Sequence, residues 1–240
     1  MRDAKCGSVG YDFSVSPNSA RGRFITFEGL DGCGKSTQAE KLANVLQARG
    51  FSVLVTREPG GTATGEKIRQ VLLDISTSEL TPPAELALMF ASRAQHIQEV
   101  IQPALACGRI VLCDRFTDST EAYQGGGRKL GSNAVLALHQ ILCGGLQPDL
   151  TILMDSNIAA SVERARRRNR ARSSRSGNDE NRFEQESRAF FSRVRNTYLA
   201  IAEREPRRVV VVDARGQADA THNKIVEVVL GRLKLAARTA

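Results

Sequence analysis

The chain has 240 residues, 41% of them apolar, which is enough for one sizeable hydrophobic core and at most two domains. No apolar run approaches the roughly 20 residues that a membrane helix needs, so we expect a soluble protein without a membrane partner. The net charge is +8, and the stretch from Glu163 to Arg182 holds eight arginines against three acids. That stretch therefore carries most of the excess positive charge.

The cysteines and the N-terminus indicate a cytoplasmic protein. The five cysteines form neither a CxxC pair nor a zinc-like spacing, and an odd number argues against a disulfide framework. The N-terminal residues lack the apolar stretch of a secretory signal. We interpret residues 1–22 as a loose extension and residues 23–238 as a single domain.

Short β-branched or apolar runs alternate with longer stretches of helical period. The runs predict buried parallel strands at 24–28, 52–56, 109–114, 150–155 and 208–213. The longer stretches predict helices at 36–49, 66–73, 83–107, 132–142, 157–168, 184–205 and 218–237. Such alternation predicts an α/β layered fold.

A glycine-rich loop lies between the first predicted strand and helix, where residues 29–36 match the pattern G-x-x-x-x-G-K-S/T. Its glycines allow backbone N–H groups to point inward, and the helix N-terminus adds a positive dipole. We expect Lys35 to neutralise the β- and γ-phosphates of ATP or GTP, and the Ser36 hydroxyl to ligate Mg²⁺. The residues expected to bind the nucleotide here are Gly29, Leu30, Asp31, Gly32, Cys33, Gly34, Lys35, Ser36 and Thr37.

Charged residues follow two further predicted strands, at the edge where open α/β sheets bind ligands. Asp114 resembles the acid that holds Mg²⁺ in P-loop proteins, and Arg115 follows where an ATPase motor usually places a water-activating Glu. A guanidinium grips phosphate through two hydrogen bonds, so Arg115 favours a phosphate acceptor over water. Arg57, in a turn that contains Pro and Gly, is another phosphate-contact candidate. Either arginine could instead be a solvated surface charge.

Four further segments follow one another along the chain and read FEG at 27–29, REPGGT at 57–62, DRF at 114–116 and AYQGGGR at 122–128. In this order they resemble the bacterial thymidylate kinases, which are P-loop nucleoside monophosphate kinases. The resemblance covers about residues 23–235 and implies a P-loop NTPase three-layer fold, with a five-stranded parallel sheet surrounded by helices, in a homodimer. The implied reaction is Mg²⁺-dependent transfer of the ATP γ-phosphoryl group to dTMP, giving dTDP and ADP for dTTP biosynthesis.

The resemblance also implies which residues meet the acceptor phosphate and sugar. Asp31 is expected near both groups, through metal or water. Arg57 and Arg115 match the arginines that bind the acceptor phosphate. Tyr123 matches the ring that crowds the C2′ position of the sugar, where a ribose hydroxyl would clash.

A second set of residues is implied for the base. Arg93 matches the arginine that hydrogen-bonds the thymine carbonyl, and Ser119 and Gln124 occupy positions that contact the base. The family's stacking Phe lies four residues before that arginine, where this chain has Met89. We expect Phe90 to stack on the base instead, and the alternatives are a thioether contact from Met89 or a purely structural role for Phe90.

The arginine-rich stretch is similar to the basic lid of the bacterial enzymes and is expected to be mobile over about residues 163–186. Some family members carry a catalytic arginine inside the phosphate-binding loop, but Cys33 occupies that position here. We expect Arg168 to reach the transferring phosphoryl group, and Arg164 and Arg166 to contact ATP. The expected catalytic residues are Lys35, Arg115, Arg168 and Asp31, and the expected metal ligands are Ser36 and Asp114.

Two alternatives stay open at this point. The same phosphate machinery would serve a kinase for another deoxynucleotide such as dUMP or dGMP, since only a few side chains read the acceptor. The arginine tract could instead grip nucleic acid in an ATP-dependent P-loop protein. The tract lacks interleaved aromatic residues, which makes a nucleic-acid partner the weaker hypothesis.

Overall fold

The computed structural model describes residues 21–77, 79–176 and 182–234, and for 172–176 the backbone alone. The predicted extension thus lies outside the described residues except for Arg21 and Gly22. The strands are β1 Phe24–Glu28, β2 Val53–Arg57, β3 Ile110–Asp114, β4 Leu150–Asp155 and β5 Val209–Asp213. The helices are α1 Lys35–Ala48, α2 Ala63–Leu73, η1 Ile75–Thr77, α3 Pro82–His96, η2 Ile97–Ile101, α4 Gln102–Ala106, α5 Thr117–Thr120, η3 Glu121–Gly127, α6 Ser132–Cys143, α7 Ile158–Ser176, α8 Arg188–Arg204 and α9 Ala218–Leu233.

The strands form one parallel sheet in the order β2-β3-β1-β4-β5. The central strand β1 pairs with β3 through Phe24 and Val111, and with β4 through Ile25 and Leu150. All five residues of β1 are buried, as expected for a parallel strand covered by helices on both faces. The predicted α/β fold and five-stranded parallel sheet are confirmed.

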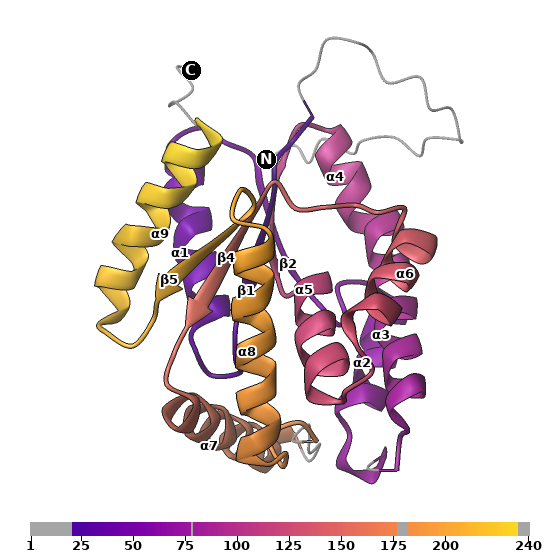
Figure 1. The fold of residues 1–240 in the computed structure, drawn as a ribbon. Helices are drawn as coiled ribbons and strands as arrows, with labels where there is room; N and C mark the ends of the chain where they lie inside the picture. Colours follow the sequence, from indigo (N-terminus) through magenta and orange to yellow (C-terminus); the bar gives the residue numbers. More distant parts are fainter. Residues whose placement is uncertain (1–20, 78, 177–181, 235–240) are drawn as a thin grey trace.

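Helices cover both faces of the sheet (Figure 1). On one face, α1 and α9 bury Leu42 and Ile225 in the same cluster as Ile152 of β4. On the other face, α3, α4 and α6 pack around Phe24 of β1, and α8 packs on Leu153 of β4. The hydrophobic core is therefore split by the sheet into two layers.

Several helices differ from their predicted bounds, and α2 begins three residues earlier than predicted, at Ala63. The helix expected at 83–107 is interrupted by the π-helical turn η2, just before Pro103, which has no backbone N–H to donate. The helix expected at 184–205 begins only at Arg188, because the Ser187 hydroxyl caps it by accepting a hydrogen bond from Phe190 N at 3.2 Å. The helix expected at 157–168 continues to Ser176.

The helical turns α5 and η3 lie where no element is predicted, because the three glycines at 125–127 read as a loop. A Cβ on Gly126 would lie 2.0 Å from Thr197 Oγ1, and one on Gly127 would lie 2.5 Å from the Phe190 ring. These glycines therefore let α8 pack closely against η3. The contact fixes the segment that carries Tyr123 and Gln124.

The carboxyl ends of all five strands lie along one edge of the sheet, and α7 lies beyond that edge (Figure 1). In open α/β sheets this edge is where ligands bind. Within the described ranges, no helix has the length and apolar character to cross a membrane.

Candidate active site

A cavity of about 390 Å³ opens at the carboxyl ends of β1, β2 and β3. It is lined by Asp31, Gly32, Gly34, Lys35, Ser36, Thr37, Arg57, Glu58, Pro59, Arg69, Leu73, Met89, Arg93, Asp114, Arg115, Ser119, Thr120, Tyr123, Gln124, Arg168, Asn169, Phe183 and Glu184. Its walls come from segments far apart in the chain, and most residues expected to meet a ligand are among them.

The glycine-rich loop joins β1 to α1 at one end of this cavity. Gly29, Gly32 and Gly34 all have positive φ, and a Cβ on Gly32 would lie 2.2 Å from Ser161 O. Lys35 is 6% exposed and folds back over the loop, donating to Leu30 O at 2.9 Å and to Gly29 O at 3.2 Å. The loop thus has the compact shape that a phosphate cradle requires.

Ser36 and Asp114 meet across the start of α1 and the end of β3. The Ser36 hydroxyl donates to Asp114 Oδ2. The other carboxylate oxygen, Oδ1, is buried and accepts no hydrogen bond from the described residues. A buried acceptor without a partner is costly, and hydroxyl and carboxylate oxygens are the ligands that Mg²⁺ prefers. The residues present therefore fit a magnesium ion.

Arg115 is the centre of a hydrogen-bond cluster beside the loop. Its Nη2 donates to Asp31 Oδ1 at 2.8 Å and to the Tyr123 hydroxyl at 3.2 Å. Its Nη1 donates to Ser119 Oγ at 2.8 Å and to the Tyr198 hydroxyl at 3.1 Å. Its φ of 74° lies in the left-handed region, which for a residue other than glycine signals local strain of the kind found at functional sites.

The charges in this cluster shift the pKa of their neighbours. Burial alone would raise the pKa of Asp31, but the Arg115 guanidinium and then the Lys35 ammonium outweigh it, so that pKa is lowered. Burial raises the pKa of Tyr123 well above its usual range despite the nearby arginine. Asp31 is therefore an anion and Tyr123 a neutral phenol at physiological pH.

Glu28, the last residue of β1, shares the Ser119 and Tyr198 hydroxyls with Arg115. Its carboxylate accepts hydrogen bonds from Phe116 N at 2.7 Å, from the Tyr198 hydroxyl at 3.0 Å and from Ser119 Oγ. Burial, followed by the nearby Asp118 carboxylate, raises the pKa of Glu28 to about 7. This carboxyl therefore titrates near neutral pH, unlike an ordinary glutamate.

Arg93 of α3 reaches the far end of the cavity and is 2% exposed. Its Nε donates to Glu58 Oε2 at 2.6 Å, and its Nη2 donates to Phe116 O at 3.1 Å and Thr120 Oγ1 at 2.9 Å. Its remaining nitrogen, Nη1, is buried and has no partner among the described residues. The guanidinium lies between two aromatic rings, with its carbon 5.1 Å from the Phe90 centroid and 5.2 Å from that of Phe116.

Met89, and not Phe90, lines the cavity. Phe90 is fully buried in the cluster of α3, α4 and α6, where its ring packs against Arg93. The structure therefore does not bring the predicted stacking ring to the ligand space. A helix advances 100° per residue, so neighbouring positions face different ways, and Phe90 faces the core here.

Gln124 and Arg57 lie at different depths in the site. Gln124 is buried, and its amide nitrogen donates to Glu85 Oε1 at 2.7 Å. Arg57 lines the rim with its side chain 52% exposed, and its Nη2 pairs with Glu66 Oε2 at 2.9 Å. Of these two predicted contacts, Gln124 is preorganised by its hydrogen bond. Arg57 is held only by a surface ion pair, which contributes little to stability.

The three arginines predicted in the lid lie in different places. Arg168 lines the cavity. Arg164 donates from Nε to Gly32 O at 2.8 Å, outside the cavity, and Arg166 donates from Nε to Glu184 O at 2.9 Å. Residues 177–181 of the predicted lid lie outside the described residues. Gly29, Leu30 and Cys33, also predicted to bind ATP, do not line the cavity, although Gly29 and Gly32 shape the loop around it.

Sequence reasoning missed several lining residues, notably Glu58, Thr120, Asn169, Phe183 and Glu184. Glu58 stands within the REPGGT motif beside the predicted Arg57, so the motif could have indicated it. Burial, followed by the Asp31 charge, raises the pKa of Glu184 to about 7. Asn169 donates to Glu184 Oε1 at 2.7 Å. Thr120 belongs to no phosphate motif, and Asn169, Phe183 and Glu184 lie within the predicted lid, where only the fold shows that they reach the cavity.

A phosphate-binding loop, an acid suited to Mg²⁺ and a separate arginine cluster facing one cavity define a P-loop kinase that acts on a small phosphorylated acceptor. The sequence profile of a family described as Thymidylate kinase matches residues 27–225. The chain belongs to the thymidylate kinase family.

Relatives and a solved structure agree with this assignment. The chain is 51% identical over 210 residues to a thymidylate kinase of Trichlorobacter lovleyi, covering 88% of this chain and 98% of the relative. It is 48% identical over 212 residues to one from Geobacter sulfurreducens, with the same two coverages. The crystal structure of a thymidylate kinase from Ehrlichia chaffeensis aligns with a TM-score of 0.68 and 31% identity, covering 87% of this chain and 98% of that one. The predicted family, fold and kinase function are confirmed.

Proposed function

We propose that the two ends of the cavity divide the reaction of this thymidylate kinase between ATP and dTMP. The loop at 29–36 holds the ATP phosphates, and the region of Arg93, Ser119 and Gln124 holds the thymidylate. The observation that carries this proposal is the position of Arg115, which lines the cavity and is ion-paired to Asp31 of the loop. A phosphate bound to Arg115 would face one held by the loop, as in-line transfer requires.

The loop side neutralises and orients the donor. The Lys35 ammonium lies over the loop, where it would exchange its bonds to Gly29 O and Leu30 O for bonds to ATP phosphate oxygens. Ser36 and Asp114 would hold Mg²⁺, an assignment supported by the Asp114 oxygen without a partner. The ion, when bound, would supply positive charge that stabilises the charge developing during phosphoryl transfer.

The far side reads the thymine base. The free Nη1 of Arg93 is a buried donor without a partner, which a base carbonyl would satisfy. Gln124 donates its amide nitrogen to Glu85, so its amide oxygen is left for the base N3–H. Met89, which lines the cavity, replaces Phe90 as the side chain proposed to contact the face of the ring.

Arg168 completes the catalytic set from α7. It is the one predicted lid arginine on the cavity wall, and its charge also lowers the pKa of Asp31. A guanidinium that reaches the transferring group stabilises the charge that spreads over its oxygens. Tyr123, a neutral phenol beside Asp31, would close the sugar pocket against a ribose 2′-hydroxyl.

We also propose a homodimer located in the cytoplasm. The homodimer is supported by exposed apolar side chains on α6, where Leu136, Ile141 and Leu142 are 36%, 74% and 44% exposed. The cytoplasm is supported by the free thiols of Cys33 and Cys113, since a reducing compartment keeps thiols unpaired. Light scattering on the purified chain gives the mass directly, and a monomeric mass would contradict the homodimer.

The deciding experiment is a coupled ADP-release assay with ATP, Mg²⁺ and dTMP, dUMP, dGMP, dCMP or thymidine, with Lys35→Ala as the blank. Lys41→Ala is the matched control, because Lys41 lies on α1 like Lys35 but pairs at the surface with Asp219 of α9. We expect dTMP to dominate and Lys35→Ala to lose turnover while keeping its fold. Turnover of dUMP or dGMP in preference to dTMP would contradict the proposed base contacts.

A further inference from the structure

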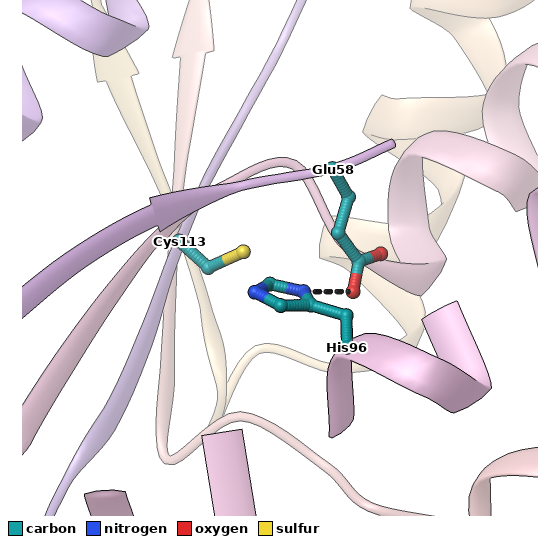
Figure 2. A group of neighbouring side chains, drawn as sticks. All are labelled: Glu58, His96 and Cys113. Carbon is teal, nitrogen blue, oxygen red and sulfur yellow. Dashed lines mark hydrogen bonds and ion pairs between the residues drawn. The ribbon is translucent and has the colours of Figure 1, made fainter. Parts of the chain in front are cut away.

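Glu58, His96 and Cys113 form a buried cluster (Figure 2), and Glu58 also lines the cavity together with Arg93. Glu58 follows β2, His96 ends α3 and Cys113 belongs to β3, and the three side chains point toward one another. Their ligand atoms lie within 4.8 Å of each other, and the three residues are 4%, 0% and 0% exposed. Such a set could hold either a metal ion or a chain of hydrogen bonds.

The contacts favour a chain of hydrogen bonds. His96 Nδ1 lies 3.0 Å from Glu58 Oε1, and His96 Nε2 lies 2.7 Å from Thr56 Oγ1, so both ring nitrogens are engaged. Cys113 Sγ donates a hydrogen bond to Arg115 O at 3.1 Å, so the thiol keeps its proton, whereas a metal ligand is a thiolate. The adjacent Arg93 guanidinium would also repel a cation.

The series of hydrogen bonds runs from Thr56 through His96 and Glu58 to Arg93. One Glu58 oxygen is fixed by His96, so the other is aimed at Arg93 Nε, 2.6 Å away. With Nε and Nη2 both engaged, the plane of the guanidinium is set and Nη1 is left as the free donor. His96 thereby acts on a nitrogen that it does not touch.

The neighbouring backbone is built around the imidazole. A Cβ on Gly61 would lie 2.5 Å from His96 Nε2 and 3.0 Å from Thr56 Oγ1, so only a residue without a side chain fits there. The φ of Gly61 is +80°, which also favours glycine. The turn after β2 thus presses on His96 from the side opposite Glu58.

We propose that His96 is a positioning residue for base recognition, which orients Arg93 toward a pyrimidine carbonyl through Glu58. The inference rests on the proposed function, in which Arg93 reads the base. The expected benefit is preorganisation. A hydrogen-bond donor that is already held in place loses less conformational entropy when the base binds. Loss of the imidazole donor would let Glu58 and Arg93 turn together.

A matched set of variants separates the two ring nitrogens. In His96→Asn the side-chain amide can take the place of Nδ1 and donate to Glu58, whereas in His96→Gln the amide extends toward the place of Nε2 and Thr56. We expect His96→Asn to keep the KM for dTMP within about threefold, and His96→Gln and His96→Leu to raise it about tenfold, which corresponds to one hydrogen bond to a charged group. The KM for ATP should not change in any of the three.

Two further measurements would not respond to a general loss of packing: the selectivity for dTMP over dCMP, and the energetic coupling between His96 and Arg93. The ratio of kcat/KM for dTMP to that for dCMP, whose amino group replaces the carbonyl, should fall about tenfold in His96→Gln but not in His96→Asn. In an Arg93→Lys background, His96→Gln should have no further effect, because the two residues act through one contact. The melting temperatures of His96→Asn and His96→Gln are compared first, to show that both variants fold. If His96→Leu does not fold, the comparison of His96→Asn with His96→Gln alone tests the proposal.

Three outcomes would overturn the proposal. These are equal KM values for dTMP in His96→Asn and His96→Gln, additive effects with Arg93→Lys, and stoichiometric zinc in the purified wild-type chain whose removal weakens dTMP binding. If the wild-type chain turns over no dTMP above the Lys35→Ala blank, the proposed function itself fails. The two failures are therefore distinguishable.

Discussion

Arg115 at the end of β3 and Asp31 in the phosphate-binding loop form an ion pair, with 2.8 Å between Nη2 and Oδ1. In the proposed function this pair would link the donor side of the cavity to the acceptor side. An acceptor phosphate bound at Arg115 would bring a second anion to the same guanidinium, and Asp31 would have to share or release it. We therefore expect binding of the acceptor to be coupled to the shape of the loop.

Replacing Arg115 tests this coupling. Lysine keeps the charge but lacks the planar fork that serves four oxygen partners here. We expect Arg115→Lys to raise the KM for dTMP by about tenfold or more and to leave the KM for ATP within about threefold. Arg215→Lys, an exposed arginine paired with Asp213, is the control and should match the wild type. An unchanged KM for dTMP in Arg115→Lys would remove this residue from the acceptor site.

Arg168 is expected to act on the transition state more than on binding. In phosphoryl transfer, an arginine that reaches the reacting oxygens contributes about 10³ to 10⁵ in rate. Arg168→Ala should therefore lower kcat by about 10³ with a small change in the KM for dTMP. Arg167→Ala, an exposed neighbour on the same helix, should change little. A larger loss in Arg164→Ala or Arg166→Ala than in Arg168→Ala would assign the role elsewhere.

The proposed magnesium ligands predict a shift in metal requirement. Asp114→Asn and Ser36→Ala should each raise the Mg²⁺ concentration for half-maximal rate by about tenfold or more, because each removes an oxygen ligand or its charge. Asp155→Asn, at the end of β4 and paired with Arg195, is the matched control at another strand end. Magnesium titrations at saturating ATP and dTMP measure the shift. Identical titration curves for the two site variants and the control would count against the site.

Glu28 predicts a pH dependence of stability. Its pKa rises from 4.5 to about 7 in the folded chain, so between these values the unfolded chain releases a proton that the folded chain keeps. The contribution of this carboxyl is therefore fully present below pH 4.5 and is lost as the pH rises to about 7.

The neutral variant Glu28→Gln isolates this effect. The free energy of unfolding of the wild type, relative to the variant, should fall between pH 4.5 and 7 and then level off. Urea unfolding at several pH values measures the difference, and Glu227→Gln on the surface of α9 serves as the control. A wild-type-minus-variant difference that is constant with pH would contradict the raised pKa.

Replacing Glu85, at the edge of the site, is expected to lower the free energy of unfolding. This fully buried carboxylate of α3 pairs with Arg128 at 3.2 Å and with Arg182 at 2.7 Å, and it accepts from Gln124. Glu85→Gln removes one charge from a buried cluster, which costs about 3–5 kcal/mol when the partners stay buried. Denaturant unfolding should show this loss, together with a raised KM for dTMP through Gln124.

The exposed pair of Glu227 and Lys224 provides the comparison for Glu85. Glu227→Gln should cost less than about 1 kcal/mol, since water already screens that pair. A similar, small cost for both variants would mean that the Glu85 cluster contributes no more than a surface pair.

The strands and the phosphate-binding loop could be predicted from the sequence because both are local patterns. Buried parallel strands are short apolar runs, and the loop has fixed spacing between Gly29 and Ser36. The bounds of α7 and α8 were less predictable, since α7 continues through a stretch that mixes good helix formers (Arg, Ala) with weaker ones (Ser, Asn), and the Ser187 cap delays the start of α8.

The base-reading side was harder to predict because it depends on tertiary contacts. Which of two adjacent side chains of α3 faces the cavity is decided by how that helix packs, and the packing turns Met89 outward and Phe90 inward. The roles of Glu58 and Glu85 depend on partners 35 and 39 residues away in the chain. No local pattern encodes such pairs.

The left-handed backbone of Arg115 is strained, and the contacts of its side chain hold it in that conformation. An L-residue with a side chain pays about 1–3 kcal/mol to adopt φ 74°, whereas glycine adopts it freely. Glycine at residue 115 would relieve that strain, but it would leave Asp31 without its ion pair and three hydroxyl groups without their donor. A substitution that stabilises this position therefore has to keep a guanidinium as well as satisfy the backbone.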